Sequence, residues 1–337
     1  MTARTTESIA DQDWPSSAHA AGRYIAARIA GSHQVPGVSL DVDRSARADK
    51  MPAMHLPVVV EDGPFAAVRV AEAGAPRQDS SFRGFLDGTQ DARVVGQANG
   101  VPIIWGTVAA AVRVRVDRRL VSWPGHDPIV ERRFYLPFRY VTGAVDDLRS
   151  QALVSDTTSG DLSRQVPSRH PAALMEAAMD GVQRDRERVE TRLAEAWCTA
   201  ESDPLYIDGG ISASATLSQS PLAVGVIKSH RQLHADGDAF PVLVGLAAGE
   251  RTSLFLIGSE KRNRVISWYL RLRDASRRDA LFGLVRVEAA ESTTPARANE
   301  VSRWLMAEGS PLALPDSRWD KMAYGIRGTE EFLRAIA

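Results

Sequence analysis

Two aspartates, each followed directly by glycine at the end of an apolar run, are the first candidates for chemistry in this chain. The runs read Phe85-Leu86-Asp87-Gly88-Thr89 and Leu205-Tyr206-Ile207-Asp208-Gly209-Gly210. Each pattern predicts a short buried strand that carries a carboxylate to a sheet edge, where glycine lets the chain turn at once. Two carboxylates that meet in a site with little water need a cation, and a divalent metal between carboxylates is typical of phosphoryl chemistry. An ordinary Asp-Gly turn is the alternative for either pair.

A glutamate on the segment before Asp208 could complete such a site. Residues from Pro171 to about Ala200 predict a helix, whose apolar stripe consists of Leu174, Ala178, Val182, Val189, Leu193 and Trp197. Glu190 falls at the edge of this stripe, beside Arg186, and Asp185 competes with it from a position nearer the stripe centre. The remaining glutamates fall on the solvated side of the helix: Glu176, Glu187 and Glu195. A solvated or ion-paired residue is the alternative for Glu190.

Basic residues after the next apolar run could bind a phosphate. The run Gly225-Val226-Ile227 is followed by Lys228, Ser229, His230 and Arg231. A lysine that leaves a strand near two carboxylates can hold a phosphate as a point charge, with an ordinary basic surface cluster as the alternative. Trp268 and Tyr269 lie among further arginines, which is typical either of a surface on which bases stack or of an exposed strand face. Those basic residues are Lys261, Arg262, Arg264, Arg271, Arg273, Arg277, Arg278 and Arg286.

The elements that must position these residues are strands interrupted by a few helices. Strands are predicted at Leu56–Val60, Phe65–Val70, Val101–Val116, Glu131–Val141, Ala223–Ile227, Pro241–Leu246, Ser253–Ile257, Val265–Leu272 and Leu281–Val287. Helices are predicted at Ser17–Ala30, Pro171–Ala200, Ala296–Ala307 and from Trp319 to the last residue. A long loop is predicted for residues 144–170. This order predicts an α/β fold with a mixed sheet flanked by helices.

Composition excludes several classes of protein. The formal net charge of the 337 residues is −1, so any nucleic-acid binding must come from local basic patches. Cys198 is the only cysteine, which excludes an intramolecular disulfide and a cysteine zinc cluster. No secretory signal and no apolar run of membrane-spanning length is visible, so we expect a cytoplasmic protein without a membrane partner. The chain also lacks a P-loop, a dinucleotide fingerprint, a Gly-x-Ser-x-Gly elbow and a HExxH motif.

Taken in order, these stretches resemble the NurA nuclease family. The carrying stretches are Gly84–Thr89, Val101–Val116, the helix before Leu205–Gly210, Gly225–Ser229 and Gly283–Glu288, which together span about residues 80–325. The resemblance implies an RNase H-like nuclease domain over residues 80–337. Residues 1–79 then form an N-terminal segment with a helix and short strands, and helical additions stand at both ends.

The resemblance also implies an activity: a metal-dependent DNA exo- or endonuclease that processes DNA ends with a HerA-type hexameric translocase. Such an enzyme would be a homodimer, with residues 1–55 and the C-terminal helix contributing to assembly. Its cofactor would be Mn²⁺ or Mg²⁺, as two ions about 4 Å apart that bind the scissile phosphate.

The site residues follow from the same resemblance. Asp87 and Asp208 match the two metal-site aspartates, and Glu190 matches the helix glutamate. Lys228 would act with them as a phosphate clamp, and the expected DNA contacts are Lys228, His230, Arg231 and Arg286. The family often has a late metal-site histidine in a proline-rich segment. Here that segment, Ser310–Arg318, has none, so Asp316 is expected as the fourth ligand, with Asp320 as the alternative.

Two other functions compete with this hypothesis. One is a non-catalytic member of the family that binds DNA and the translocase. The other is an actin- or hexokinase-like phosphotransferase, which would need a phosphate loop rich in glycine and threonine after each Asp-Gly pair. Asp87-Gly88-Thr89-Gln90 and Asp208-Gly209-Gly210-Ile211-Ser212 meet that requirement only in part.

Overall fold

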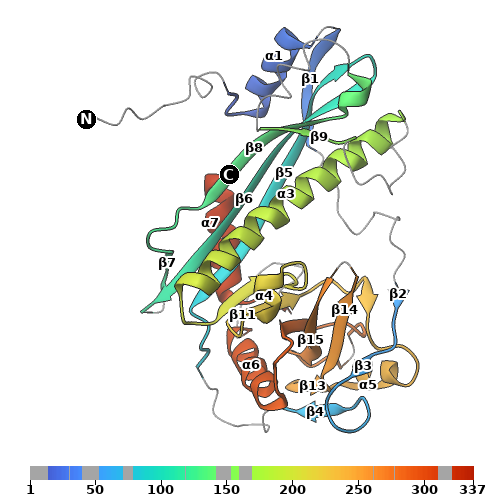
Figure 1. The fold of residues 1–337 in the computed structure, drawn as a ribbon, viewed down its shortest axis with the longest axis vertical. Coiled ribbons are helices and arrows are strands. Elements are labelled where there is room, and N and C mark those ends of the chain that lie inside the picture. Colours follow the sequence, from blue (N-terminus) through green and yellow to red (C-terminus); the bar gives the residue numbers. More distant parts are fainter. Residues whose placement is uncertain are drawn as a thin grey trace.

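The computed structural model describes residues 14–29, 31–39, 53–70, 79–117, 119–141, 153–158, 169–260, 262–276, 278–309 and 321–337. Within these ranges the chain is a mixed α/β protein whose large sheet carries helices on both faces (Figure 1). The strands are β1 (Ser32–Ser39), β2 (Ala53–Met54), β3 (Val58–Val59), β4 (Ala67–Arg69), β5 (Gly84–Ala98), β6 (Val101–Val116), β7 (Arg119–Ser122), β8 (Ile129–Leu136), β9 (Val154–Asp156), β10 (Leu205–Asp208), β11 (Ala223–Ile227), β12 (Gln232–Leu233), β13 (Glu250–Thr252), β14 (Phe255–Ser259), β15 (Arg262–Arg271) and β16 (Leu284–Ala290). The helices are α1 (Ala18–Arg28), α3 (Pro171–Ala200), α4 (Ala215–Gln219), α5 (Ala239–Gly245), α6 (Pro295–Glu308) and α7 (Tyr324–Ile336).

The centre of the sheet joins antiparallel and parallel strands. In the order β8-β6-β5-β10-β11, the first three strands are antiparallel neighbours, while β10 runs parallel to both β5 and β11. Beyond β11 the sheet continues through β16, β15 and β14, all antiparallel. The crossover that leads into β10 is helix α3, as a parallel connection requires.

Helix α3 covers one face of this sheet, along β5 and β6 (Figure 1). Pro171 occupies its first turn, where proline suits a helix start, and the His170 ring accepts a hydrogen bond from the Ala172 N–H. Its predicted apolar stripe is buried against strand residues such as Leu86, Ile104 and Ile207. The length of this helix and the side it presents to the sheet are therefore as the sequence predicts.

Helices α6 and α7 cover the opposite face. Phe85, Tyr206 and Val226 point to this side and form a core with residues of both helices. Gly325 lets the first turn of α7 approach closely, because a Cβ at this position would collide with the Phe85 ring. Successive residues of β5 thus alternate between the α3 face and the α6/α7 face, which decides where its polar side chains lie.

Residues before position 79 contribute strands to the same sheet. β1 pairs with β5, β3 with β14, and β4 with β13. Helix α1 packs at the far end, where β1 lies in Figure 1, against Val95, Ile103 and Phe134. The division of the chain at residue 79 stays a prediction.

Several of the predicted elements differ from the structure. Pro241–Leu246 lies mostly in helix α5, with Leu243 and Leu246 buried, because periodicity cannot distinguish so short an apolar run in a helix from a strand. Glu131–Val141 is a strand only to Leu136 and then enters a 3₁₀ turn at Phe138–Tyr140 after Pro137. Part of the predicted 144–170 loop is strand β9, which pairs with β8. Of Leu56–Val60 only β3 is a strand.

None of the helices within the described ranges has the length and apolarity needed to cross a membrane.

Candidate functional site

The candidate site lies where β10 ends while its neighbour β5 continues. β10 pairs with β5 as far as Ile207 opposite Leu86, and β1 joins the same side of β5 only from Arg93 onward. Between these two points β5 keeps β6 as its partner on the other side. No residue of the described ranges pairs with residues 88–92 of β5 on that side, so the sheet is interrupted there and side chains from both faces can approach each other.

Asp87 and Asp208 lie on the same face at this interruption. They follow Phe85 and Tyr206 by two residues each, so the pleat directs them to the α6/α7 side. Asp87 is only 7% exposed, and its Oδ1 accepts a hydrogen bond of 2.8 Å from the Gly88 N–H. Asp208 is the last residue of β10, and Gly209 follows with a φ of 143°, which favours glycine.

The prediction of an immediate turn is therefore confirmed at Asp208 and wrong at Asp87. Strand β5 continues through Gly88 to Ala98, because it forms a long antiparallel ladder with β6. Gly88 serves another purpose. A Cβ built at Gly88 would lie 2.8 Å from both Cγ and Cδ of Glu190, and closer still to its Oε1. The glycine is needed so that the glutamate can rest on the strand.

Glu190 reaches the site from α3, on the face opposite to the two aspartates. Its Oε1 accepts a hydrogen bond of 2.9 Å from Nη1 of Arg186, one turn earlier on the helix. The same Nη1 lies 3.4 Å from the Gly88 carbonyl oxygen, at the free edge of β5. Both side chains are largely buried, so this pair belongs to the site and not to the solvated side of the helix.

Lys228 supplies the second positive charge. Its Nζ donates a 2.8 Å hydrogen bond to Oδ2 of Asp208 and lies 4.0 Å from the sulfur of Met322. The lysine side chain is 10% exposed, compared with 22% for Asp208. The structure thus brings together the four residues expected to act in catalysis, Asp87, Glu190, Asp208 and Lys228, and it adds Arg186.

The pKa of Asp87 is raised well above its ordinary value. Burial is the largest cause, and the negative charge of Asp208 adds to it, followed by that of Glu190; the ammonium of Lys228 opposes them. Three carboxylates here face two cationic side chains, so the group retains one excess negative charge when all are ionised. Such a site favours either a proton on Asp87 or an added cation.

The three carboxylates form an all-oxygen donor set, which in its chemistry suits a hard divalent ion. As positioned, however, no three His, Cys, Asp or Glu side chains of the described residues are arranged to hold a metal ion. The cause is visible in the contacts, because Asp208 is paired with Lys228 and Glu190 with Arg186. Asp316 and Asp320, the expected and alternative fourth ligands, lie outside the described residues.

Glu288 holds the loop that follows Asp208, a role that the sequence did not indicate. Its Oε2 accepts hydrogen bonds from the backbone N–H of Ile211 and Ser212, at 2.8 and 3.3 Å. Its Oε1 accepts one of 2.9 Å from Nη1 of Arg286. The only sequence signal was a charged Arg-x-Glu pair inside an otherwise apolar strand. Charged side chains are rarely buried in a strand unless each one is paired.

The expected DNA contacts are less exposed than their sequence context indicates. The Nε2–H of His230 donates a 2.8 Å hydrogen bond to the Leu284 carbonyl oxygen, and burial lowers the pKa of the ring to about 4, so the ring is neutral near pH 7. Arg286 is paired with Glu288. The backbone carbonyl of Arg231 accepts a hydrogen bond from Ala53. Of the expected contacts, Lys228 is the one that the structure places among the carboxylates.

A base-stacking surface at Trp268 and Tyr269 is contradicted. Both rings are fully buried, with the Trp268 Nε1 donating to the Ser302 hydroxyl and the Tyr269 hydroxyl accepting from the His234 N–H. Arg271 is buried as well and donates to backbone carbonyls, among them that of Ala280 at 3.0 Å. The aromatic and basic pattern reflects strand packing here, because β15 lies inside the sheet with neighbours on both sides.

Other acidic residues of α3 have partners outside the site. Asp185 accepts a 2.7 Å hydrogen bond from the Tyr135 hydroxyl and lies near Arg133, which removes it as a competitor of Glu190. Glu187 accepts from Gln183 in an exposed pair, as its solvated position predicts. Glu195, also expected in solvent, instead accepts from Ser214, the N-cap residue of α4.

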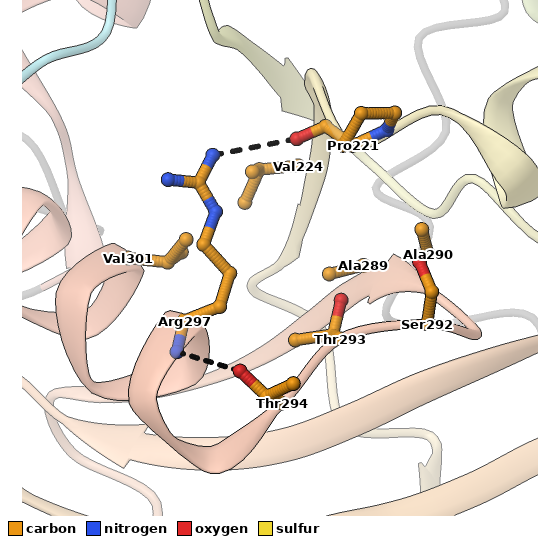
Figure 2. Close-up of a pocket in the computed structure, with 9 residues that line it drawn as sticks. All are labelled: Pro221, Val224, Ala289, Ala290, Ser292, Thr293, Thr294, Arg297 and Val301. Atoms are coloured by element: carbon orange, nitrogen blue, oxygen red, sulfur yellow. Dashed lines mark hydrogen bonds between the residues drawn. The ribbon is translucent and has the colours of Figure 1, made fainter.

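A separate pocket lies on the other side of β11, beside the start of α6. Figure 2 shows Arg297 extended across it, with its guanidinium donating to the Pro221 carbonyl and its backbone N–H donating to the Thr294 hydroxyl. Val224 and Ala289 form part of its apolar lining. The Arg297 guanidinium also pairs with Glu300. Its charge is therefore already compensated, and the carboxylate site remains the stronger candidate for chemistry.

Neither a comparison with models of known protein families nor one with curated proteins finds a match to this chain.

Proposed function

We propose that this chain is a divalent-metal-dependent deoxyribonuclease of the NurA type with an RNase H-like fold. The observation that carries the proposal is that Asp208 on one face and Glu190 on the other both lie near enough to Asp87, beside the end of β10, for their negative charges to raise its pKa. Mn²⁺ or Mg²⁺, as two ions, would be the cofactor, because these ions prefer oxygen ligands.

The order of the strands supports the RNase H-like part of the proposal. Such a fold requires three antiparallel strands followed by a helix and two parallel strands, with the central strand carrying the first carboxylate. The strands β5, β6 and β8, helix α3, and the strands β10 and β11 follow this scheme, and Asp87 stands on the central strand β5.

The chemistry would divide between the metal and the side chains. Asp87, Asp208 and Glu190 would hold the ions, which supply an activated water and stabilise the negative charge of the leaving oxygen. Lys228 would bind a nonbridging oxygen of the scissile phosphate once its bond to Asp208 is exchanged.

The proposal extends to partners and location. We propose DNA ends as substrate, a homodimer, a HerA-type ATPase hexamer as partner, and a cytoplasmic location. An exposed apolar row supports an assembly surface, since such rows mark contacts with other chains. Its members alternate along the segment at the β3 edge, with exposed fractions of 40% for Met54, 71% for Leu56, 60% for Val58 and 49% for Val60.

Cleavage of labelled linear DNA by the purified protein tests the activity directly. Single-stranded and duplex substrates are incubated with Mn²⁺, with Mg²⁺ or with EDTA. Cleavage that needs the metal and disappears in Asp87→Asn and Asp208→Asn is the expected result. Glu187→Gln, an exposed change on α3, serves as the matched control. Equal cleavage by the wild type and both aspartate variants would refute the site assignment.

A non-catalytic DNA- or translocase-binding protein is the second candidate. The pairing of Asp208 with Lys228 and of Glu190 with Arg186 favours it, because the carboxylates are satisfied without a metal. It predicts DNA binding without cleavage under every metal condition. The phosphotransferase alternative has lost support, since β5 continues through Gly88 and Thr89 and leaves no phosphate loop after Asp87.

A further inference from the structure

Arg186 makes an incomplete set of contacts for an arginine in so enclosed a place. Its Nη1 donates to Glu190 Oε1 at 2.9 Å and approaches the Gly88 carbonyl at 3.4 Å. Its Nε is buried without a hydrogen-bond partner within the part of the chain that the structure describes. An unsatisfied buried donor costs free energy, so this arrangement of the guanidinium is less stable than a fully bonded one.

The position of Glu190 also differs from what a metal ligand needs. The carboxylate rests on Gly88 from the α3 side, while Asp87 and Asp208 point to the α6/α7 side. Arg186 Nη1 bonds both Glu190 Oε1 and the Gly88 carbonyl oxygen, and these two contacts hold the carboxylate on the α3 side. The glycine leaves room for Glu190 to move toward the two aspartates, because there is no side chain at position 88 to block it.

We infer that Arg186 is the resident counter-ion of Glu190, which a divalent cation must displace before Glu190 can join Asp87 and Asp208. The inference rests on the proposed function and adds a regulation of the same site. Arg186 neutralises Glu190 in the metal-free protein, and metal binding exchanges the arginine for the ion. The cost of breaking the ion pair therefore lowers the metal affinity of the wild type.

Mn²⁺ titration followed by electron paramagnetic resonance measures this cost, because only free Mn²⁺ gives the sharp six-line signal. Arg186→Gln is expected to bind Mn²⁺ about fivefold more tightly than the wild type, which corresponds to an ion pair worth about 1 kcal/mol. Arg186→Lys keeps a charge one turn from Glu190 and is expected to stay within about twofold of the wild type. Arg192→Gln, an exposed change on the same helix, should leave the affinity unchanged.

A second background separates displacement from a general effect of charge. In Glu190→Gln the counter-ion has no carboxylate to hold, so adding Arg186→Gln should give no further gain in affinity. A gain that persists there, or an Arg186→Gln affinity equal to or weaker than that of the wild type, overturns the inference. Circular dichroism melting of each variant confirms that it is folded.

Failure of the proposed function has a different signature. In that case the wild type binds Mn²⁺ no better than a double variant carrying Asp87→Asn and Asp208→Asn, and the counter-ion role falls with it. If the wild type binds more tightly than this double variant and the Arg186 series shows no change, only the inference about Arg186 is wrong.

Discussion

Replacing Gly88 by alanine tests whether Glu190 rests on strand β5. The new Cβ would lie 2.8 Å from Cγ and Cδ of Glu190, whereas carbon atoms pack at about 3.5–4.0 Å. The glutamate must therefore move by roughly 1 Å, which weakens its 2.9 Å bond to Arg186. We expect about 1–3 kcal/mol for the overpacking and up to about 1 kcal/mol for the ion pair. Alanine in place of a strand glycine stabilises the fold by about 0.5–1 kcal/mol, so the free energy of unfolding should fall by about 2 kcal/mol in total.

A double-mutant cycle tests whether the collision with Glu190 causes this loss of stability. In a Glu190→Ala background the collision is absent, so Gly88→Ala should be neutral or stabilising by about 0.5 kcal/mol. Urea unfolding followed by circular dichroism measures all four proteins. Gly245→Ala is the control, because nothing lies within 4 Å of a Cβ at that helix position. An equal cost of Gly88→Ala in both backgrounds would refute the placement of Glu190 against the strand.

Three further outcomes are expected. Glu190→Gln should lower metal-dependent cleavage by at least about a hundredfold while Glu187→Gln is silent, and a reversed ranking in initial rates would show that another face of α3 serves the site. Lys228→Met should destabilise the metal-free protein by between about 1 and 3 kcal/mol, since it leaves Asp208 unpaired in a partly buried site; unchanged urea midpoints would contradict the pair. His230 has a pKa of about 4 when folded against 6.5 in the unfolded chain. The unfolded state therefore binds the proton first, and the free energy of unfolding falls as pH drops from 6.5 to 4, by about 3 kcal/mol in total. His230→Asn should remove that part of the slope in unfolding measured across this range, and an unaltered slope would argue against a buried neutral ring.

The long elements of this fold could be predicted from the sequence because each one carries its own signal. Val101–Val116 is apolar enough to be buried on both faces, and it is a strand over the predicted residues. Pro171 and the stripe from Leu174 to Trp197 define the start and the buried side of α3. The helix phase also placed Glu190 at the sheet, since 3.6 residues per turn leaves little freedom once the stripe is known.

Short apolar runs carried no comparable signal. Pro241–Leu246 became part of a helix, and Trp268 and Tyr269 turned inward, because both outcomes depend on which neighbours cover the segment. Sequence pattern reports apolarity and period, and both were compatible with either result.

The sequence by itself determined that two strand carboxylates, a helix glutamate and a lysine could form one site, since residue types and strand or helix periods are local properties. Only the tertiary structure decided how they meet. It ended β10 at Asp208 but let β5 continue past Asp87, because β6 offers β5 a partner along its whole length. It also paired Glu190 with Arg186 and placed Glu190 against Gly88, where a larger residue would collide with it. Contacts between a helix and a strand about a hundred residues earlier depend on how closely the two elements pack.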